Sequence, residues 1–177
     1  MDKVYEIEYL NHRLANLFMI PLGAAALFIA DKLPIIENLL IRMVCNIIFV
    51  LLVCIIFSRI SNFIFQKNGV VKLTNSELKV TLDNKEYDYY LSDIKEIIMA
   101  YRHPLGTGLL GNCITLIIKP KEGKSLSIIS VRNFNKKRME DHKYSKIFNH
   151  IKGLNPTMDF EASITGNFFV LKNHSCK

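Results

Sequence analysis

Two apolar blocks separated by a short polar turn fill much of the first third of the chain. Residues 14–30 contain 17 residues and no charge, and residues 38–57 contain 20 residues and one charge, Arg42. About 20 apolar residues in a helix cross the hydrocarbon core of a bilayer, so the first block is near the lower limit. Two adjacent runs of this purity favour a transmembrane hairpin over the buried helical hairpin of a soluble protein. A secretory signal peptide fits poorly, because a second apolar block follows at once.

The segments on either side of this hairpin have their own patterns. Residues 1–13 include an alternation of apolar and polar residues over 4–10, which is typical of a half-buried strand or an interfacial segment, and which could pair with the domain that follows. Residues 58–66 keep helical spacing. They predict a helical stalk that ends before Asn68 and Gly69.

From Gly69 the hydrophobic period becomes two. Short alternating runs bounded by polar turns predict six strands, at residues 70–73, 77–82, 86–91, 94–102, 113–119 and 124–131. Glu96 would share a face with Ile94 in a regular strand, so we expect a bulge near Lys95 and Glu96 that puts Ile94 and Ile97 on the same, buried side. Six short strands joined by tight turns predict a small antiparallel β-barrel or sandwich.

One helix is expected after the strands. It would be capped by Asn133 or Asn135, run to about residue 152, end at Gly153 and close one end of the barrel. Residues 157–177 have strand-like content around a Gly-Asn pair, and their pattern leaves a last hairpin and a flexible tail both open.

Basic residues are concentrated after the hairpin. Residues 1–57 contain 4 of the 23 Lys and Arg and 5 of the 16 Asp and Glu, which leaves 19 − 11 = +8 for residues 58–177. The cations near the membrane ends place both termini in the cytoplasm by the positive-inside rule. The basic domain would then lie beside anionic lipids of the inner leaflet, which attract cations.

The β-rich region resembles the bacterial pleckstrin-homology-like (PH-like) domains. The resemblance is carried by Asn68-Gly69-Val70-Val71-Lys72-Leu73-Thr74, by Leu91-Ser92-Asp93-Ile94-Lys95-Glu96-Ile97 after a tyrosine-rich strand, and by residues 147–156 as a closing helix. It covers residues 67–156, and it implies that Asp93 accepts backbone hydrogen bonds where its strand begins. In that family the domain often follows two transmembrane helices. The resemblance implies a non-enzymatic protein of the bacterial inner membrane that presents a cytoplasmic PH-like domain to a protein partner or to anionic lipid.

Two other functions stay open. Two spans followed by a small β-rich domain is also similar in layout to bacterial anti-phage membrane effectors whose β-domain senses a cyclic nucleotide. A third hypothesis is immunity against a membrane-active peptide.

Two groups of polar residues are the candidate binding sites. The cations Lys119, Lys121 and Lys124 belong to a predicted hairpin tip, and Lys136, Lys137 and Arg138 to an early helical turn; both sets suit lipid headgroups or another polyanion. Within the second apolar block, Arg42 and Asn46 share one helix face, where polar groups prefer a protein neighbour to lipid. Packing of the hairpin and assembly of a homo-oligomer would both use them.

Other chemistry is weakly represented. Gly106, Gly108 and Gly111 match the pattern of a dinucleotide-binding loop, but a strand follows them where that site needs a helix. The five histidines lack metal-ligand spacing and are expected on the solvated surface, and the four cysteines contain no CxxC pair. Nucleic acid is a poor candidate partner, because the domain would be tethered to a membrane and because only two of the three tyrosines Tyr87, Tyr89 and Tyr90 share one face of their strand. We therefore expect no cofactor and no enzymatic activity.

Overall fold

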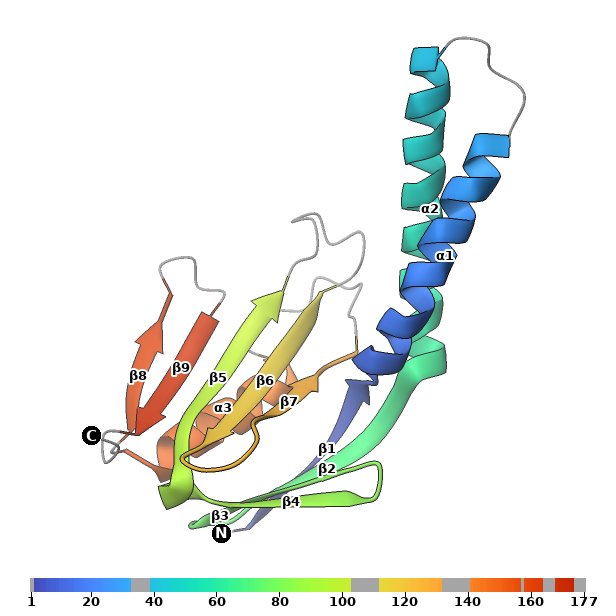
Figure 1. Cartoon of the computed structure of the whole chain (residues 1–177). Coiled ribbons are helices and arrows are strands. Elements are labelled where there is room, and N and C mark those ends of the chain that lie inside the picture. The colour runs from blue at the N-terminus through green and yellow to red at the C-terminus, as the bar shows by residue number, and fades with distance from the viewer. Residues whose placement is uncertain are drawn as a thin grey trace.

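The computed structural model describes residues 2–32, 39–102, 112–131, 141–156, 158–163 and 168–173 (Figure 1). The elements follow the chain in the order β1 (Lys3–Leu10), α1 (His12–Lys32), α2 (Leu39–Phe65), β2 (Gln66–Leu73), β3 (Glu77–Leu82), β4 (Lys85–Tyr90), a 3-10 turn (Leu91–Asp93), β5 (Ile94–Arg102), β6 (Cys113–Pro120), β7 (Leu126–Ile129), α3 (Lys143–Leu154), β8 (Met158–Ala162) and β9 (Phe168–Asn173).

The helix pair is inserted into a β-hairpin. β1 precedes α1 and pairs antiparallel with β2, which follows α2, from Lys3 opposite Leu73 to Leu10 opposite Gln66. The alternating segment 4–10 is therefore a strand of the β-domain, as one of the expectations for it stated. Figure 1 shows α1 and α2 leaving the sheet side by side. The strand-paired part of the chain thus begins at Lys3 and ends at Asn173, and it extends beyond the expected range 67–156 in both directions.

Sheet A contains four antiparallel strands in the order β1-β2-β3-β4. Its inner face is apolar and its outer face is mostly polar, because successive side chains alternate between the two faces. Asp83 and Asn84 form the predicted turn between β3 and β4 with positive φ angles of 50° and 61°. Asp and Asn tolerate this left-handed conformation better than other non-glycine residues.

Sheet B contains five antiparallel strands in the order β7-β6-β5-β9-β8. The predicted bulge is present, since the register of β5 against β6 shifts between Ile94 and Glu96. Ile94 and Ile97 are both fully buried as a result. The chain after residue 157 forms the hairpin β8–β9, which extends sheet B along the other edge of β5.

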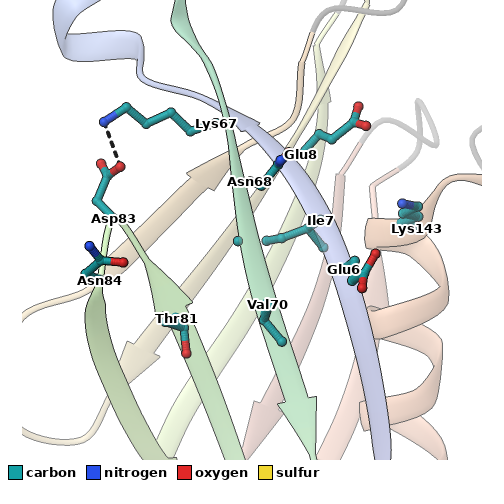
Figure 2. A pocket seen from close by; sticks show the side chains of 11 residues that line it. Glu6, Ile7, Glu8, Lys67, Asn68, Val70, Thr81, Asp83, Asn84 and Lys143 are labelled. Carbon is teal, nitrogen blue, oxygen red and sulfur yellow. Dashed lines mark hydrogen bonds and ion pairs between the residues drawn. The ribbon is translucent and has the colours of Figure 1, made fainter.

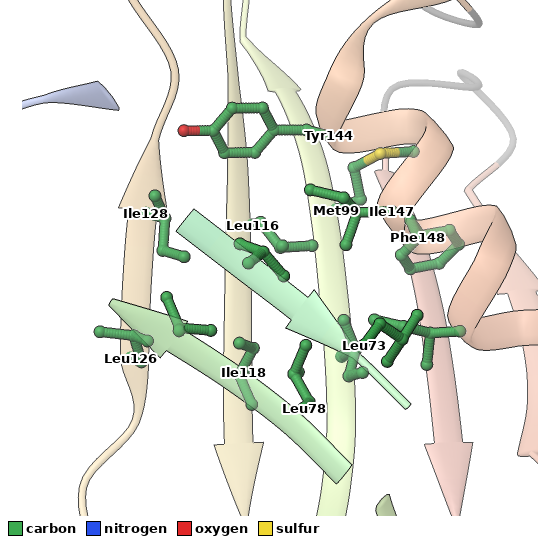
Figure 3. Close-up of a cluster of buried hydrophobic side chains, with 14 of the residues drawn as sticks. Leu73, Leu78, Met99, Leu116, Ile118, Leu126, Ile128, Tyr144, Ile147 and Phe148 are labelled. Atoms are coloured by element: carbon green, nitrogen blue, oxygen red, sulfur yellow. The ribbon is translucent and has the colours of Figure 1, made fainter. Parts of the chain in front are cut away.

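The core lies between the two sheets, and one face of α3 completes it (Figure 3). Tyr144, Ile147, Phe148 and Ile151 on that face are almost completely buried. Within the described residues the sheets form a sandwich and no closed barrel, so the expectation that a helix closes a barrel end was wrong. The N-cap of α3 is His142 and its C-cap is Asn155, so Gly153 belongs to the last turn and does not end the helix. Asn133 and Asn135 lie outside the described residues.

The stalk prediction was wrong at its end. α2 stops at Phe65 and β2 starts at once with Gln66, so Asn68 and Gly69 lie inside a strand. Gly69 is required by packing: a Cβ there would lie 2.7 Å from Leu82 Cδ2 and 2.9 Å from the carbonyl oxygen of Thr81. The glycine lets β1, β2 and β3 approach closely where Ile7, Gly69 and Leu82 stand in register.

One helical segment within the described residues, Leu40–Phe65, is long and apolar enough to cross a membrane. Its large side chains are exposed along most of its length, for example Leu40, Met43, Ile47, Leu52 and Ile56. α1 packs along this helix. Among the α1 residues whose side chains are described, the buried ones are Ala15 and Ala26.

Candidate functional site

The strand registers divide the sandwich into two ends. The helix-proximal end is the one at which β1 runs into α1 and α2 runs into β2. Sheet B is tied to it by a bridge between Tyr9 and Ser130, which follows β7. The opposite, distal end contains Lys3 and Leu73 of sheet A, together with the turn between β6 and β7 (Figure 1).

The first predicted cation set lies at the distal end. Lys119 is the last residue but one of β6, and its Nζ forms an ion pair with the partly buried carboxylate of Glu96 on the neighbouring strand β5. Lys121 and Lys124 are exposed in the β6–β7 turn. This turn therefore lies away from the end at which the helices leave, and two of the three predicted cations, Lys121 and Lys124, are exposed.

The second predicted set, Lys136, Lys137 and Arg138, lies outside the described residues. The described residues that flank this stretch are Val131, which follows the Ser130 bridge, and Asp141, which precedes α3. α3 begins at the helix-proximal end, because the Tyr144 hydroxyl donates a 3.1 Å hydrogen bond to the carbonyl oxygen of Glu8.

Arg42 and Asn46 lie on the side of α2 that is least exposed. Both side chains are half-buried, and the same spacing of three or four residues continues along α2 through Val50, Cys54, Ser58, Ser61 and Phe65. Ser58 and Ser61 are fully buried, and the Ser61 hydroxyl donates to the carbonyl oxygen of Ser58 at 3.0 Å. Phe65 contacts Phe18 of α1, with ring centroids 5.6 Å apart, so this side of α2 faces α1 at least at its base.

A groove of about 1030 Å³ opens on sheet A near the helix-proximal end (Figure 2). We call it the junction groove. It is lined by residues of β1, β2, the β3–β4 hairpin and the start of α3: Glu6, Ile7, Glu8, Lys67, Asn68, Gly69, Val70, Thr81, Asp83, Asn84 and Lys143. Its charged groups are three carboxylates and two ammonium groups, so the lining is mixed in sign.

The charges of the junction groove differ in how they are compensated. Lys67 Nζ donates to Asp83 Oδ1 at 2.6 Å, and this hydrogen bond lowers the pKa of the Asp83 carboxyl. Burial, reinforced by the same carboxylate, raises the pKa of Tyr9 to about 12. Glu6, Glu8 and Lys143 have exposed side chains and make no ion pair within the described part of the chain. The groove therefore presents two carboxylates and one ammonium group to a ligand.

The described histidines of α3 have structural contacts. His142 caps the helix by accepting from the Tyr144 N–H at 3.3 Å, and His150 Nδ1 lies 2.9 Å from the Tyr5 hydroxyl. The expectation of solvated surface histidines was wrong for these two, which are half-buried. No group of three or more metal-ligating side chains occurs among the residues that the structure describes.

No family model, no curated protein and no solved structure matches this chain.

Sequence reasoning found the cations of the β6–β7 turn but missed the junction groove. Glu6 and Glu8 were visible as the polar positions of an alternating segment, but their partner strand lies beyond two helices. The Asp83-Asn84 turn was predicted, yet nothing local indicates that Lys67 reaches it. A signal was present in the motif Asn68-Gly69, because a glycine inside a strand marks a close approach of backbones.

Proposed function

We propose that this is a non-enzymatic protein of the bacterial inner membrane that holds a PH-like β-sandwich at the cytoplasmic surface and presents the distal end of that sandwich to a protein partner. Both helices of the pair would cross the membrane. The observation that carries the proposal is the direct continuity of α1 with β1 and of α2 with β2, because an inserted helix pair would turn the helix-proximal end of the β-domain toward the bilayer.

Two features support the PH-like part of the proposal: the antiparallel strands β2 to β7, and the helix α3 that follows them and packs on the core. The strand β1 ahead of the helix pair and the hairpin β8–β9 after α3 lie outside the pattern expected for such a domain.

A protein partner suits the distal end better than the lipid of the same membrane. Lys121 and Lys124 lie in the turn farthest along the sheet from the helix bases, so they would point into the cytoplasm. Lys119 is engaged by Glu96 and contributes less to a binding surface. Two exposed cations on a short turn suit an acidic segment of a protein. Complementary charges across such an interface favour the correct partner over others.

The orientation is tested by cysteine labelling in a background without native cysteines. Lys124→Cys should be labelled in spheroplasts only after permeabilisation, and Lys32→Cys, at the far end of α1, should be labelled without it. The reverse pattern would overturn the cytoplasmic placement. Extraction of the protein by alkaline carbonate would overturn membrane insertion itself.

The partner is tested by photocrosslinking in cells from an analogue placed at Glu122, between the two lysines. We expect crosslinked species that Lys121→Glu and Lys124→Glu weaken severalfold. Lys85→Glu, the same charge change at an exposed position at the start of β4, toward the helix-proximal end, is the matched control and should leave them unchanged. An equal loss of crosslinked species in all three variants, or no loss in any of them, would contradict a partner site at this turn.

A further inference from the structure

A pocket of about 380 Å³ opens at the distal end of the sandwich, and we call it the distal pocket. Its lining comes from the β2–β3 turn, the end of β4 with the 3-10 turn that follows, the end of α3 and the end of β9. The lining residues are Asn75, Ser76, Tyr90, Leu91, Ser92, Leu154, Asn155 and Asn173. None of these side chains carries a charge at neutral pH, so the distal pocket differs in chemistry from the junction groove.

The distal pocket combines an apolar inner side with polar walls. Leu91 is 4% exposed and Leu154 is half-buried, so these two leucines form its inner side. The side-chain amide of Asn173 donates to the carbonyl oxygens of Ser92 and Ile94, each at 3.3 Å. These hydrogen bonds hold the end of β9 against the 3-10 turn. The pocket is therefore formed by contacts within the chain and needs no ligand to assemble it.

Tyr90 lies at the rim of the distal pocket and is 59% exposed, whereas Phe160 and Phe168 are 42% and 40% exposed. Its ring is on the outer face of β4, away from the core between the sheets. Tyrosine is enriched in protein interfaces, because its ring is apolar and its hydroxyl forms hydrogen bonds. An exposed tyrosine beside an open pocket with an apolar inner side suits a partner's side chain that becomes buried on binding.

The distal pocket adjoins the cationic turn between β6 and β7. The Lys121 N–H donates to the carbonyl oxygen of Asp93 at 2.8 Å, and Ser92, the preceding residue, lines the pocket. Only the 3-10 turn separates the two features, and a few residues of extended chain span such a width. Because Asp93 is exposed between them, a chain that connects them should be uncharged where it crosses this residue.

We propose that the distal pocket binds one large apolar side chain of the protein partner, a few residues from the acidic residues that contact Lys121 and Lys124. This inference rests on the partner site proposed at the β6–β7 turn and adds a second recognition element to it. Two lysines alone would attract any acidic segment. A neutral pocket beside them favours only those segments that also carry an apolar side chain at the right spacing, and so provides specificity.

The experiment uses the full chain in cells, with a photocrosslinking analogue either at Asn75, on the rim of the distal pocket, or at Glu122, in the turn. Crosslinked peptides are sequenced by mass spectrometry. We expect both positions to crosslink one segment of the same protein. The residue joined to position 75 should lie next to a large apolar residue, and the residue joined to position 122 should lie among acidic ones.

Two variants test whether the pocket contributes to binding. Tyr90→Ala should lower the yield of crosslinks from position 122 about tenfold, as truncation of a tyrosine in an interface pocket does. Ser76→Trp places a bulky side chain on the rim and should lower that yield by blocking entry. The matched control is Phe168→Ala, which truncates an exposed aromatic side chain toward the helix-proximal end and should keep the wild-type yield.

The outcomes separate this inference from the proposed function. Crosslinks from position 122 that persist in both pocket variants, or that join a protein which position 75 does not reach, would overturn the distal pocket and leave the partner site at the turn intact. An equal loss of crosslinks in Phe168→Ala would also overturn the pocket. The absence of any crosslinked species from position 122 would overturn both proposals.

Discussion

Leu10 and Gln66 stand opposite each other at the end of the β1–β2 ladder, although two helices separate them in the sequence. The Asn11 N–H donates to the carbonyl oxygen of Phe65 at 3.0 Å directly beyond this pair. A small buried cluster lies at this end of the ladder and consists of Leu10, Ala15 and Phe65. The two helix bases are therefore tied to the sheet by hydrogen bonds and packing, with no linker, and the helix pair and sheet A are expected to behave as one mechanical unit.

Gly69→Ala should destabilise the protein by about 1 to 3 kcal/mol, the usual cost of overpacking a tight site. The added Cβ would contact the Thr81 carbonyl oxygen at 2.9 Å, and backbone of a central strand cannot move aside as a side chain can. The measurement is the thermal unfolding midpoint of the full chain in detergent.

Gly153→Ala is the matched control for that substitution. Gly153 lies in the last turn of α3, and a Cβ there has no atom within 4 Å. Replacing a helical glycine by alanine without a clash stabilises a protein by about 0.4 to 1 kcal/mol. If both glycine variants shift the unfolding midpoint in the same direction, the close approach of the strands at Gly69 does not determine the effect of Gly69→Ala.

The elements of the β-domain that depend on local pattern could be predicted from the sequence. The bulge in β5 is an example: the conflict between Ile94 and Glu96 on one face indicated it, and the register shift lies there. Glu96 is then free to form its ion pair with Lys119 on the outer face. The turn at Asp83-Asn84 was equally visible, because few other residues adopt positive φ angles.

Ile94→Ala and Ile97→Ala should each cost about 2 to 5 kcal/mol, the range found for cavities in well-packed cores. Both side chains are completely buried. Asp93→Ala is the control, because the structure corrects the role expected for it. The Asp93 carbonyl oxygen accepts from the Lys121 N–H at 2.8 Å, while its carboxylate accepts from the Ser92 hydroxyl at 3.0 Å. We expect Asp93→Ala to change stability by about 0.5 kcal/mol or less. Unchanged unfolding of both isoleucine variants would contradict the placement of β5.

The sequence could not identify which strand each distant segment pairs with, although it allowed residues 4–10 to pair with the later domain. The partner of β1 lies beyond α2, and the stop of α2 is set by the packing of Phe65 against Leu10 and Ala15, not by Asn68-Gly69. The junction groove could not be predicted for the same reason, because its lining comes from four separate segments: β1, β2, the β3–β4 turn and α3. A pattern within one segment carries no information about which other segment it will meet.

His150 makes stability depend on pH near neutrality. Burial is the main cause that lowers the pKa of its imidazole, and the charge of Lys3 lowers it further. The unfolded chain therefore takes up a proton more readily than the folded one below about pH 6.5. The contribution of His150 is present above that pH and is lost as the pH falls through the folded-state pKa. Unfolding midpoints of the full chain, measured from about pH 7.5 to about pH 5.5, should fall less steeply for His150→Gln than for the wild type. Identical slopes would show that the contact between His150 and Tyr5 does not exclude the charged imidazole.

Ser61 tests the packing of the helix pair. Its side chain is fully buried on the same side of α2 as Ser58, and small residues allow helices to approach closely in a membrane. Ser61→Leu should force α1 and α2 apart and, because both helix bases are tied to sheet A, should also loosen the β1–β2 ladder. We expect a lower unfolding midpoint in detergent together with faster hydrogen exchange at the amides of Ile7 and Val71. Ile60→Leu is the control, since Ile60 is 47% exposed and its replacement adds no volume. Faster exchange in both variants, or in neither, would contradict a rigid connection between the helix pair and the sheet.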